Sequence, residues 1–269
     1  MRITHPQSAY RGVPAEDTFF VTDDRQVQLG TGYLIPFVQR ELYPAQPLSI
    51  YMEITAQPSA RFLLFGALSA RAEVLKLRYP GMKARLYTQL EATDAESQAF
   101  YQRCGFQMDD AEDLFYFALP YTLPAQIPMG VQYASVPLDT DRQQDAFLQR
   151  LNEMRITPIT RDQLTLWREQ PGFLALGFYR EGRPVTELLT AGAGMNASLL
   201  QVYTRSEFRR QGMARQLILQ AAAILRERSM GGMYAHIFRR NNPQIGLMQS
   251  LGANFTRTIT LLPGIDMGP

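Results

Sequence analysis

The sequence has few of the residues from which metal sites and disulfide networks are built. Among its 269 residues there is one cysteine, Cys104, and there are two histidines, His5 and His236. A single cysteine excludes an intrachain disulfide network and a cysteine-based metal cluster. Two histidines exclude a multi-histidine metal site, so we expect no bound metal, and a Ser-His-Asp triad would have to use one of these two.

Long apolar runs and an excess of one charge are also absent. No run of about 18 apolar residues occurs, and the start of the chain lacks the apolar core of a signal peptide, so we expect no membrane span. The 27 Lys and Arg residues nearly balance the 25 Asp and Glu residues, which argues against a nucleic-acid coating protein. With 46% hydrophobic residues a sizeable core can form. We expect a soluble, cytoplasmic protein without nucleic-acid or membrane partners.

A proline-rich segment divides the chain into halves of similar size. Residues 120–128 contain three prolines, which disfavour helix and indicate an extended linker. A strand-like apolar run, 114–119, precedes this segment, and a helical pattern begins near Asp141. We therefore predict two domains, residues 1–124 and 125–269.

The second half is predicted to alternate helices and strands in the order ααββ-β-α-β-α-β. Apolar residues recur at helical spacing in the helices, and a glycine turn separates the two apolar runs of a hairpin. In chain order these elements are expected at residues 141–154, 161–169, 173–179, 184–190, 198–204, 212–228, 233–238, 243–250 and 256–262.

The first half ends in a similar order of elements. Its strands and helices are expected at residues 48–55, 60–78, 83–90, 95–103 and 114–119. In both halves a polar residue opens the last helix and a glycine follows eleven residues later, as Asp94 with Gly105 and Asn241 with Gly252. We interpret the two halves as an ancient duplication.

The stretch that ends at Ala214 carries a pattern suited to a pyrophosphate. A strand ends, a short loop turns, and a helix begins at small residues. Free backbone N–H groups at a helix N-terminus favour an anion. Gly212 and Ala214 leave room for a phosphate near the main chain, and Arg209 and Arg210 add positive charge.

This loop lacks the two commonest phosphate-binding motifs, G-x-G-x-x-G and G-x-x-x-x-G-K-[ST]. It fits the pattern [Q/R]-x-x-G-x-[G/A] at residues 209–214, with a hairpin before it and the Asn241–Gly252 segment after it. With these features the chain resembles the GNAT superfamily of N-acetyltransferases over about residues 130–262. The resemblance implies an α/β (α+β) fold of tandem GNAT-like domains. Each would have a mixed, mainly antiparallel central sheet flanked by helices, and the first would be a degenerate copy.

The resemblance also implies a site for acetyl-CoA. In the family, the strand before the loop lends main-chain groups to the pantetheine arm. The loop holds the pyrophosphate, and an asparagine after the next strand contacts the cofactor. The positions implied here are Val202, Tyr203, Thr204, Arg209, Arg210, Gln211, Gly212, Met213, Ala214 and Asn241.

One departure from the family pattern affects the proton chemistry. The family often carries a tyrosine seven residues after the asparagine, as general acid to the departing thiolate. Here that position is Met248, which cannot donate a proton. The first half shows the reverse, because Tyr101 follows Asp94 by seven residues but the preceding loop lacks the glycine.

Three residues are therefore candidates for catalysis. Tyr203 could donate a proton to the thiolate, and His236 or Glu187 could act as base, directly or through water. Each also has a structural interpretation, as a strand side chain held by packing or by a hydrogen bond.

Two functions fit these observations. The first is an N-acetyltransferase, active in the C-terminal half, in which a small-molecule or peptide amine attacks the thioester directly. A main-chain N–H of residues 201–204 would polarise the carbonyl. The second is a non-catalytic tandem protein that binds CoA or a protein partner, which Met248 favours. An aminoacyl-tRNA-dependent transferase is a weaker third option, because no basic face is visible. The acceptor amine, the acyl length and the oligomeric state stay open, with a homodimer as one option.

Overall fold

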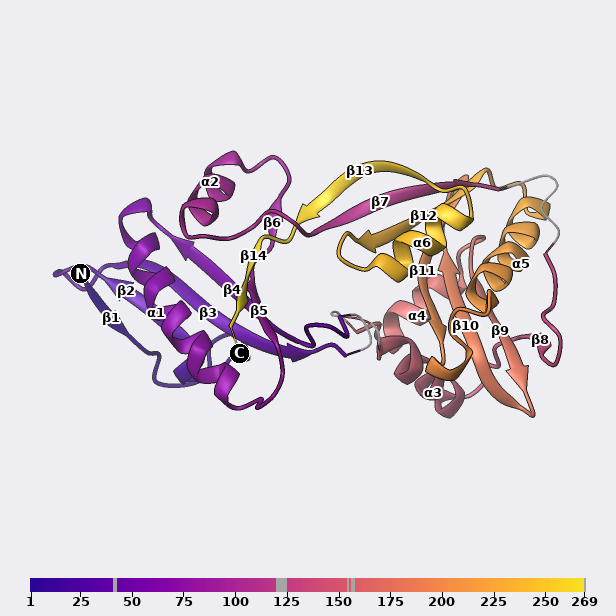
Figure 1. The fold of residues 1–269 in the computed structure, drawn as a ribbon, viewed down its shortest axis with the longest axis horizontal. Helices are drawn as coiled ribbons and strands as arrows, with labels where there is room; N and C mark the ends of the chain where they lie inside the picture. The colour runs from indigo at the N-terminus through magenta and orange to yellow at the C-terminus, as the bar shows by residue number, and fades with distance from the viewer. Residues whose placement is uncertain (41–42, 120–124, 154, 156–157, 269) are drawn as a thin grey trace. The chain divides into compact units, whose positions relative to one another are not determined.

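The computed structural model describes residues 1–40, 43–119, 125–153, 155 and 158–268. The chain forms two compact units (Figure 1), of which unit 1 is Met1–Ala111 with Thr260–Pro269 and unit 2 is Glu112–Ile259. Each unit contains a mixed, mainly antiparallel sheet flanked by helices, so the expected fold class is confirmed. Among the described residues, no helix combines the length and the apolar character needed to cross a membrane.

Unit 1 is built on a six-stranded sheet crossed by one long helix (Figure 1). In order across the sheet its strands are β1 (Arg2–Thr4), β2 (Thr18–Thr22), β3 (Gln28–Val38), β4 (Leu48–Ala56), β5 (Ala84–Tyr87) and β14 (Gly264–Met267). Its other elements are η1 (Ala15–Asp17), α1 (Pro58–Leu77), β6 (Leu90–Glu91) and α2 (Ala95–Arg103). Of the neighbouring strands, β4 and β5 run parallel and the other pairs antiparallel. Helix α1 buries Leu64, Leu68, Ala72 and Leu75, a spacing that places them on one face.

Unit 2 contains the larger sheet. In order across it the strands are β13 (Asn254–Leu261), β7 (Ala111–Ala118), β12 (Gly232–Phe238), β11 (Asn196–Thr204), β10 (Arg183–Ala191), β9 (Leu174–Arg180) and β8 (Gln132–Ser135). Strands β11 and β12 are parallel, whereas β12 pairs antiparallel with β7 and β10 pairs antiparallel with both β9 and β11. The last residues of β13, Thr260 and Leu261, belong to unit 1, where they pair with β6.

Helices cover both faces of the sheet in unit 2. They are α3 (Asp141–Asn152) and α4 (Arg161–Arg168), then α5 (Met213–Glu227) and α6 (Asn242–Ser250). Leu188 of β10 packs in one core with α5 and α6, and its neighbour Leu189 packs in another with α3 and α4. Successive strand side chains point to opposite faces, so the two helix pairs lie on opposite sides of the sheet.

Most predicted elements of the second half are present within two residues of their expected ends. Thr160 caps α4, where its hydroxyl accepts a hydrogen bond from the Gln163 N–H. The helix expected at 141–154 ends at Asn152, and Met154 lies outside the described residues. In the first half, the strand expected at 83–90 is divided into β5 and β6.

The division into units differs from the predicted boundary after residue 124. Strand β7 was expected to close the first half, but it pairs with β12 in unit 2, from Glu112↔Phe238 to Ala118↔Gly232. Conversely, β14 near the end of the chain pairs with β5 in unit 1. The residues of a strand do not specify which distant strand it will pair with, because a strand such as β7 can join the sheet of either unit. Residues 120–124 of the predicted linker lie outside the described residues.

Candidate functional site

The candidate site begins where the two parallel strands of unit 2 part. Strands β11 and β12 pair from Asn196↔Gly232 to Leu199↔Ala235. Both strands continue beyond these pairs, and in the described register they no longer pair with each other. We call this place the β11–β12 fork, defined by residues 200–204 of β11 and 236–238 of β12. On the facing edge of β11, residues 201–204 have no strand partner in the described register, and buried main-chain groups are usually paired.

A bulge in β11 lies at the base of the fork. Leu189 of β10 pairs with Gln201, but the next residue, Thr190, pairs with Leu199. Leu200 is therefore an extra residue on β11 relative to β10. Such a residue bends its strand and re-aims the groups beside it.

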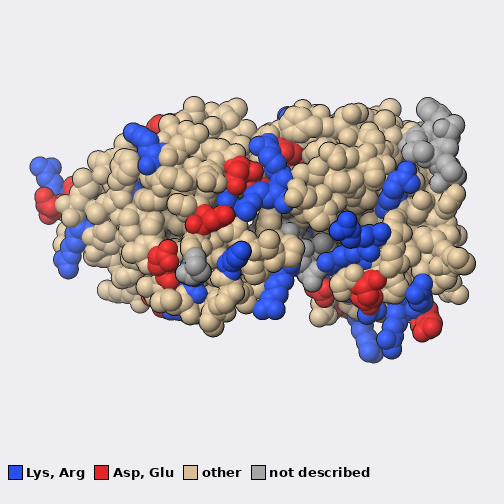
Figure 2. Space-filling view, in the orientation of Figure 1, with Lys and Arg blue, Asp and Glu red and all other residues tan. Residues whose placement is uncertain are grey.

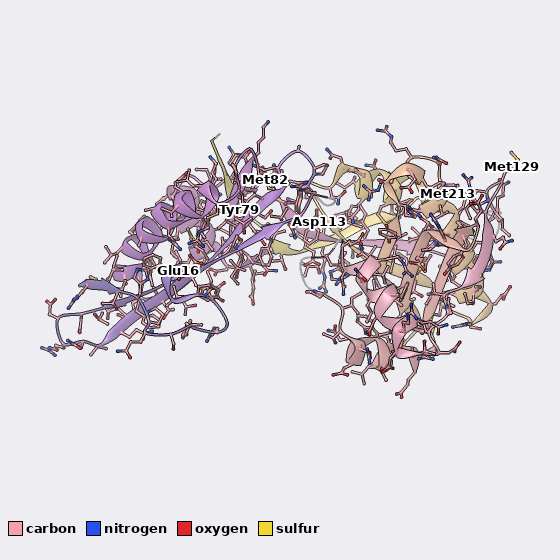
Figure 3. The ribbon with its side chains drawn as sticks, turned by 90° about the horizontal axis from the view of Figure 1, so that it is seen from below. Glu16, Tyr79, Met82, Asp113, Met129 and Met213 are labelled. Atoms are coloured by element: carbon pink, nitrogen blue, oxygen red, sulfur yellow. The ribbon has the colours of Figure 1, made fainter. Side chains whose placement is uncertain are left out.

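The loop after β11 presents free backbone N–H groups. It contains η2 (Ser206–Phe208), then two residues with left-handed backbone, Arg210 at φ 61° and Gly212 at φ 76°. Gly212 is the N-cap of α5, whose first residue, Met213, is labelled in Figure 3. Within the described part of the chain, no hydrogen bond is donated by the backbone N–H groups of residues 210–215. Free N–H groups at a helix N-terminus, together with the helix dipole, favour an anion.

Side chains hold this loop against the end of β11. Arg209 donates from Nε to the Thr204 carbonyl at 3.0 Å, and Gln211 donates from Nε2 to the Glu207 carbonyl at 3.0 Å. Arg210 is exposed and forms no ion pair among the described residues. The loop is thus tied in place while one guanidinium stays available to an anion. On the face drawn in Figure 2, basic and acidic side chains are interspersed over both units.

Asn241 is buried and caps α6. Its Oδ1 accepts a hydrogen bond from the Gln244 N–H at 3.2 Å. The corresponding Asp94 caps α2 through the Ser97 N–H at 3.0 Å. Asn241 therefore has a structural role as a helix cap, and its contact with a cofactor remains a prediction.

Met248 and Tyr101, the two positions seven residues after Asn241 and Asp94, are both buried. Met248 is 2% exposed and packs in the core with α5. Tyr101 belongs to the core of unit 1, where its ring contacts Phe100 and Phe106. Burial raises the pKa of Tyr101 to about 12. The described structure thus gives Met248 and Tyr101 packing roles.

Tyr203 lies in the fork, near the end of β11. Its side chain packs on the α3 side of the sheet, and its neighbour Val202 packs on the α5 side. Burial raises the pKa of Tyr203, so the phenol keeps its proton at neutral pH. Thr204 hydrogen-bonds through its hydroxyl to Thr186 of β10, which fixes the end of the strand.

Glu187 is fully buried in an ion pair. Its two oxygens accept hydrogen bonds from Arg150 Nε at 2.6 Å and Arg150 Nη2 at 2.8 Å. The Tyr179 hydroxyl donates to the same carboxylate at 3.2 Å. With both oxygens engaged and no exposure, Glu187 serves as an anchor for α3. A role for Glu187 as a base, directly or through water, stays a prediction.

His236 lies in the fork and is half-exposed. Its Nδ1 is 3.0 Å from Oε1 of Glu112 on β7. Arg155 donates from Nη1 to the Leu200 carbonyl at 2.8 Å and interacts electrostatically with Glu112. Burial lowers the pKa of Arg155. Sequence reasoning named only His236 of this group, because no motif indicates that β7 pairs beside β12.

Gln201 has an unpartnered donor beside this group. Its Oε1 accepts from Arg155 Nη1 at 3.3 Å, but its buried Nε2 has no hydrogen-bond partner among the described residues. A buried amide nitrogen without a partner is costly, so the fork retains a polar group suited to a ligand acceptor.

Comparisons with known proteins were made for both sequence and fold. Residues 145–253 match the acetyltransferase (GNAT) family model, and no curated protein matches the sequence. A GCN5-related N-acetyltransferase from Sphaerobacter thermophilus is 15% identical, with coverage of 96% of this chain and 84% of its own and a TM-score of 0.52. An Enterococcus faecalis V583 protein described as a probable N-acyltransferase is 12% identical, with coverage of 91% and 61% and a TM-score of 0.53. A tandem GNAT protein from the clavulanic acid biosynthesis pathway is 16% identical, with coverage of 94% and 83% and a TM-score of 0.46. The TM-scores of the first two structures show that this chain shares their fold, and identities this low show nothing beyond the fold.

Proposed function

We propose that this chain, which contains a GNAT-family acetyltransferase domain at residues 145–253, is an acetyl-CoA-dependent N-acetyltransferase. Its active site would be the β11–β12 fork of unit 2. The observation that carries this proposal is the loop between β11 and α5. Its N–H groups at residues 210–215 are free of partners among the described residues and lie at the helix N-terminus.

The residues at the fork and in the loop after β11 suit two parts of acetyl-CoA, the pyrophosphate and the arm that carries the amide groups. The free N–H groups and the exposed Arg210 suit a pyrophosphate. The edge of residues 202–204 has no strand partner in the described register. It suits an extended arm that carries amide groups, because such an arm can bond to main chain as an added strand does. When bound, the cofactor supplies an acetyl group activated as a thioester.

The chain's own residues would move the protons of the transfer. The amine nitrogen forms a bond to the carbonyl carbon as the carbon–sulfur bond breaks. His236 accepts at Nε2 the proton that the amine loses, and Tyr203 gives its phenolic proton to the departing sulfur. Main-chain N–H groups of residues 201–204 polarise the carbonyl oxygen. Each positioned acid or base typically contributes about 10²- to 10⁴-fold to the rate.

A non-catalytic CoA-binding protein is the second candidate. It is favoured by Met248, whose burial leaves the usual proton-donor position occupied by a packing residue. The two candidates share the cofactor site and differ in turnover. A small-molecule or peptide amine is the acceptor class that we propose for the enzyme.

The experiment is a calorimetric titration of the full chain with acetyl-CoA, alongside Gly212→Asp and Gly81→Asp. Both glycines have positive φ, 76° and 77°, and open space where a Cβ would be. The two variants therefore introduce the same strain and charge, one at the loop and one in unit 1. We expect saturable binding that is lost in Gly212→Asp and kept in Gly81→Asp.

Absence of binding by the intact protein would overturn the proposal, as would equal losses in both variants. A screen of amines for release of the free CoA thiol then separates the two candidates. Release with one amine class supports the transferase. Tight binding without release across the whole panel supports the non-catalytic protein.

A further inference from the structure

We infer that Glu112 is a positioning residue, which fixes the ring tautomer of His236 so that Nε2 can accept a proton. The inference deepens the proposed function and rests on it for the identity of the reaction. Its structural part, the tautomer, can be measured on the protein without any substrate.

The contact itself determines which ring nitrogen carries the proton. Nδ1 of His236 lies 3.0 Å from Oε1 of Glu112. An ionised carboxylate has only acceptors, so the shared hydrogen must be on Nδ1. In the neutral ring Nε2 is then the unprotonated nitrogen. No hydrogen bond to Nε2 is present among the described residues, and the side chain is 51% exposed. The geometry thus presents a lone pair to whatever enters the fork.

The register of the sheet places the two side chains on the same face. Glu112 is paired with Phe238, and Leu114 is paired with His236, so Glu112 and His236 are diagonal neighbours on β7 and β12. Diagonal neighbours lie within reach of long side chains. A shift of one residue would send Glu112 to the opposite face and end the contact.

The next residue on β7 shows that the two adjacent carboxylates have separate tasks. Asp113, labelled in Figure 3, points to the other face of the strand. It binds Arg239 through both oxygens at 2.9 and 2.8 Å and accepts from the Thr258 hydroxyl at 2.7 Å. Asp113 is therefore fixed in an ion pair away from His236. Its substitution is a matched control for general damage to β7.

A cation interacts with the carboxylate of the pair. Arg155 interacts electrostatically with this carboxylate and is itself bonded to the Leu200 carbonyl in the fork. The neighbours of His236 on β12, Ala235 and Ile237, are apolar and buried. Among the described residues, Glu112 is thus the charged group that the structure shows in contact with the ring.

This assignment gives the first half of the sequence a role in the site. Strand β7 precedes the proline-rich segment, and sequence reasoning placed it in the other domain. In the structure it pairs within unit 2 and carries Glu112 to the fork. A GNAT-like domain cut at residue 125 would lack this carboxylate.

The test is nitrogen-15 NMR of the histidine rings in the full-length protein. The chain has two histidines, so His236→Gln assigns the signals. We expect His236 in the wild type to be the Nδ1–H tautomer. Glu112→Ala should move it toward the Nε2–H tautomer that free histidine prefers, and Asp113→Asn should leave it unchanged. If Glu112→Ala does not fold, Glu112→Gln should lower the Nδ1–H fraction, because its amide can turn an N–H toward the ring.

The assignment is overturned if wild-type His236 is the Nε2–H tautomer, or if neither Glu112 variant changes it. With an amine that supports turnover, Glu112→Ala should lower kcat by about 10- to 100-fold with little change in the KM for acetyl-CoA. A fall in kcat without a tautomer change also contradicts the role. If the protein binds no acetyl-CoA while the tautomer depends on Glu112, the proposed function fails and the positioning contact stands.

Discussion

The two units share an order of strands and helices around one parallel strand pair. They differ in the connection that follows the first strand of that pair. In unit 1, the parallel pair β4 and β5 ends its register at Tyr51↔Tyr87. In unit 2, the parallel pair β11 and β12 ends its register at Leu199↔Ala235, after the same number of residue pairs. In both units a long helix follows the first of these strands and a short capped helix follows the second. The parting of the strands thus belongs to the fold and does not by itself mark a site.

The connections differ in length and in their supply of N–H groups. In unit 1 only Gln57 separates β4 from α1, whose first residue is Pro58. In unit 2, residues 205–212 separate β11 from α5. Proline has no N–H, so α1 lacks one of the donors that α5 presents. The proposed anion site therefore depends on the loop rather than on the sheet.

The central strands differ as well. Strand β4 pairs with β3 without a shift in register, from Gly30↔Ala56 to Val38↔Leu48. Strand β11 has the extra residue Leu200 opposite β10. Unit 2 therefore has both a bulge at the base of the fork and a long loop. In unit 1, the described pairing of β4 with β3 has no bulge, and the connection from β4 to α1 is short.

The largest effect is expected from Arg150→Ala, which would break the buried pair that joins α3 to β10. In the described part of unit 1, only β1 and η1 precede β2, so no α-helix corresponds to α3 there. The pKa of Arg150 is raised overall. Burial alone would lower it, but the hydrogen bonds and the charge of Glu187 have the larger effect. Loss of Arg150 leaves a buried charge without its partner, which typically costs about 3–5 kcal/mol. Urea denaturation measures this loss in the free energy of unfolding.

The matched control is Arg161→Ala, because Arg161 pairs with Asp145 at the surface of the same helix pair. An exposed pair contributes at most about 1 kcal/mol. Similar losses for Arg150→Ala and Arg161→Ala would show that the Glu187 pair is not a main anchor of unit 2.

The second prediction compares the two tyrosines. Tyr203→Phe removes the proposed proton donor in unit 2, and we expect kcat to fall about 100-fold because a general acid contributes on that scale. Tyr101→Phe makes the same change in the core of unit 1 and should leave kcat unchanged. Steady-state kinetics with a productive amine measure both values. A loss of kcat in Tyr101→Phe, or none in Tyr203→Phe, would reverse the assignment of roles.

The sequence predicted those parts of the molecule that local patterns determine. The 209–214 motif predicted a strand-to-helix loop, and Gly212 indeed has the left-handed backbone that a side chain would disfavour. Asn241 was also expected to open the last helix of its half, and it caps α6. Each of these features depends on a few adjacent residues, so a single sequence is sufficient.

The sequence failed where function depends on distant strands. The role of Glu112 requires the register of β7 against β12, and the burial of Glu187 requires Arg150 on α3. Neither partner is adjacent in sequence, and carboxylates on strands have the same local pattern whether they bind substrate or another side chain. The sequence also did not predict that β7 pairs in unit 2 and β14 in unit 1. The reason is the same, because the alternation of side chains does not specify the partner strand.

The smallest effect is expected from making the start of α5 resemble the start of α1. Ala214→Pro removes one first-turn N–H, and proline is tolerated in the first turn of a helix. We expect the Kd for acetyl-CoA to rise about tenfold, the scale of one charge-assisted hydrogen bond. Ala214→Val is the control, because it adds bulk at the same place and keeps the N–H. The reverse change in unit 1, Pro58→Ala, restores an N–H without the long loop and should create no second binding site. Calorimetric titration measures the binding of acetyl-CoA to all three variants.

If Ala214→Pro and Ala214→Val weaken binding equally, the loss is steric and the N–H groups of α5 do not hold the pyrophosphate. If Pro58→Ala adds a second site, the loop is not what separates the two units, and unit 1 needs only a donor to bind the cofactor.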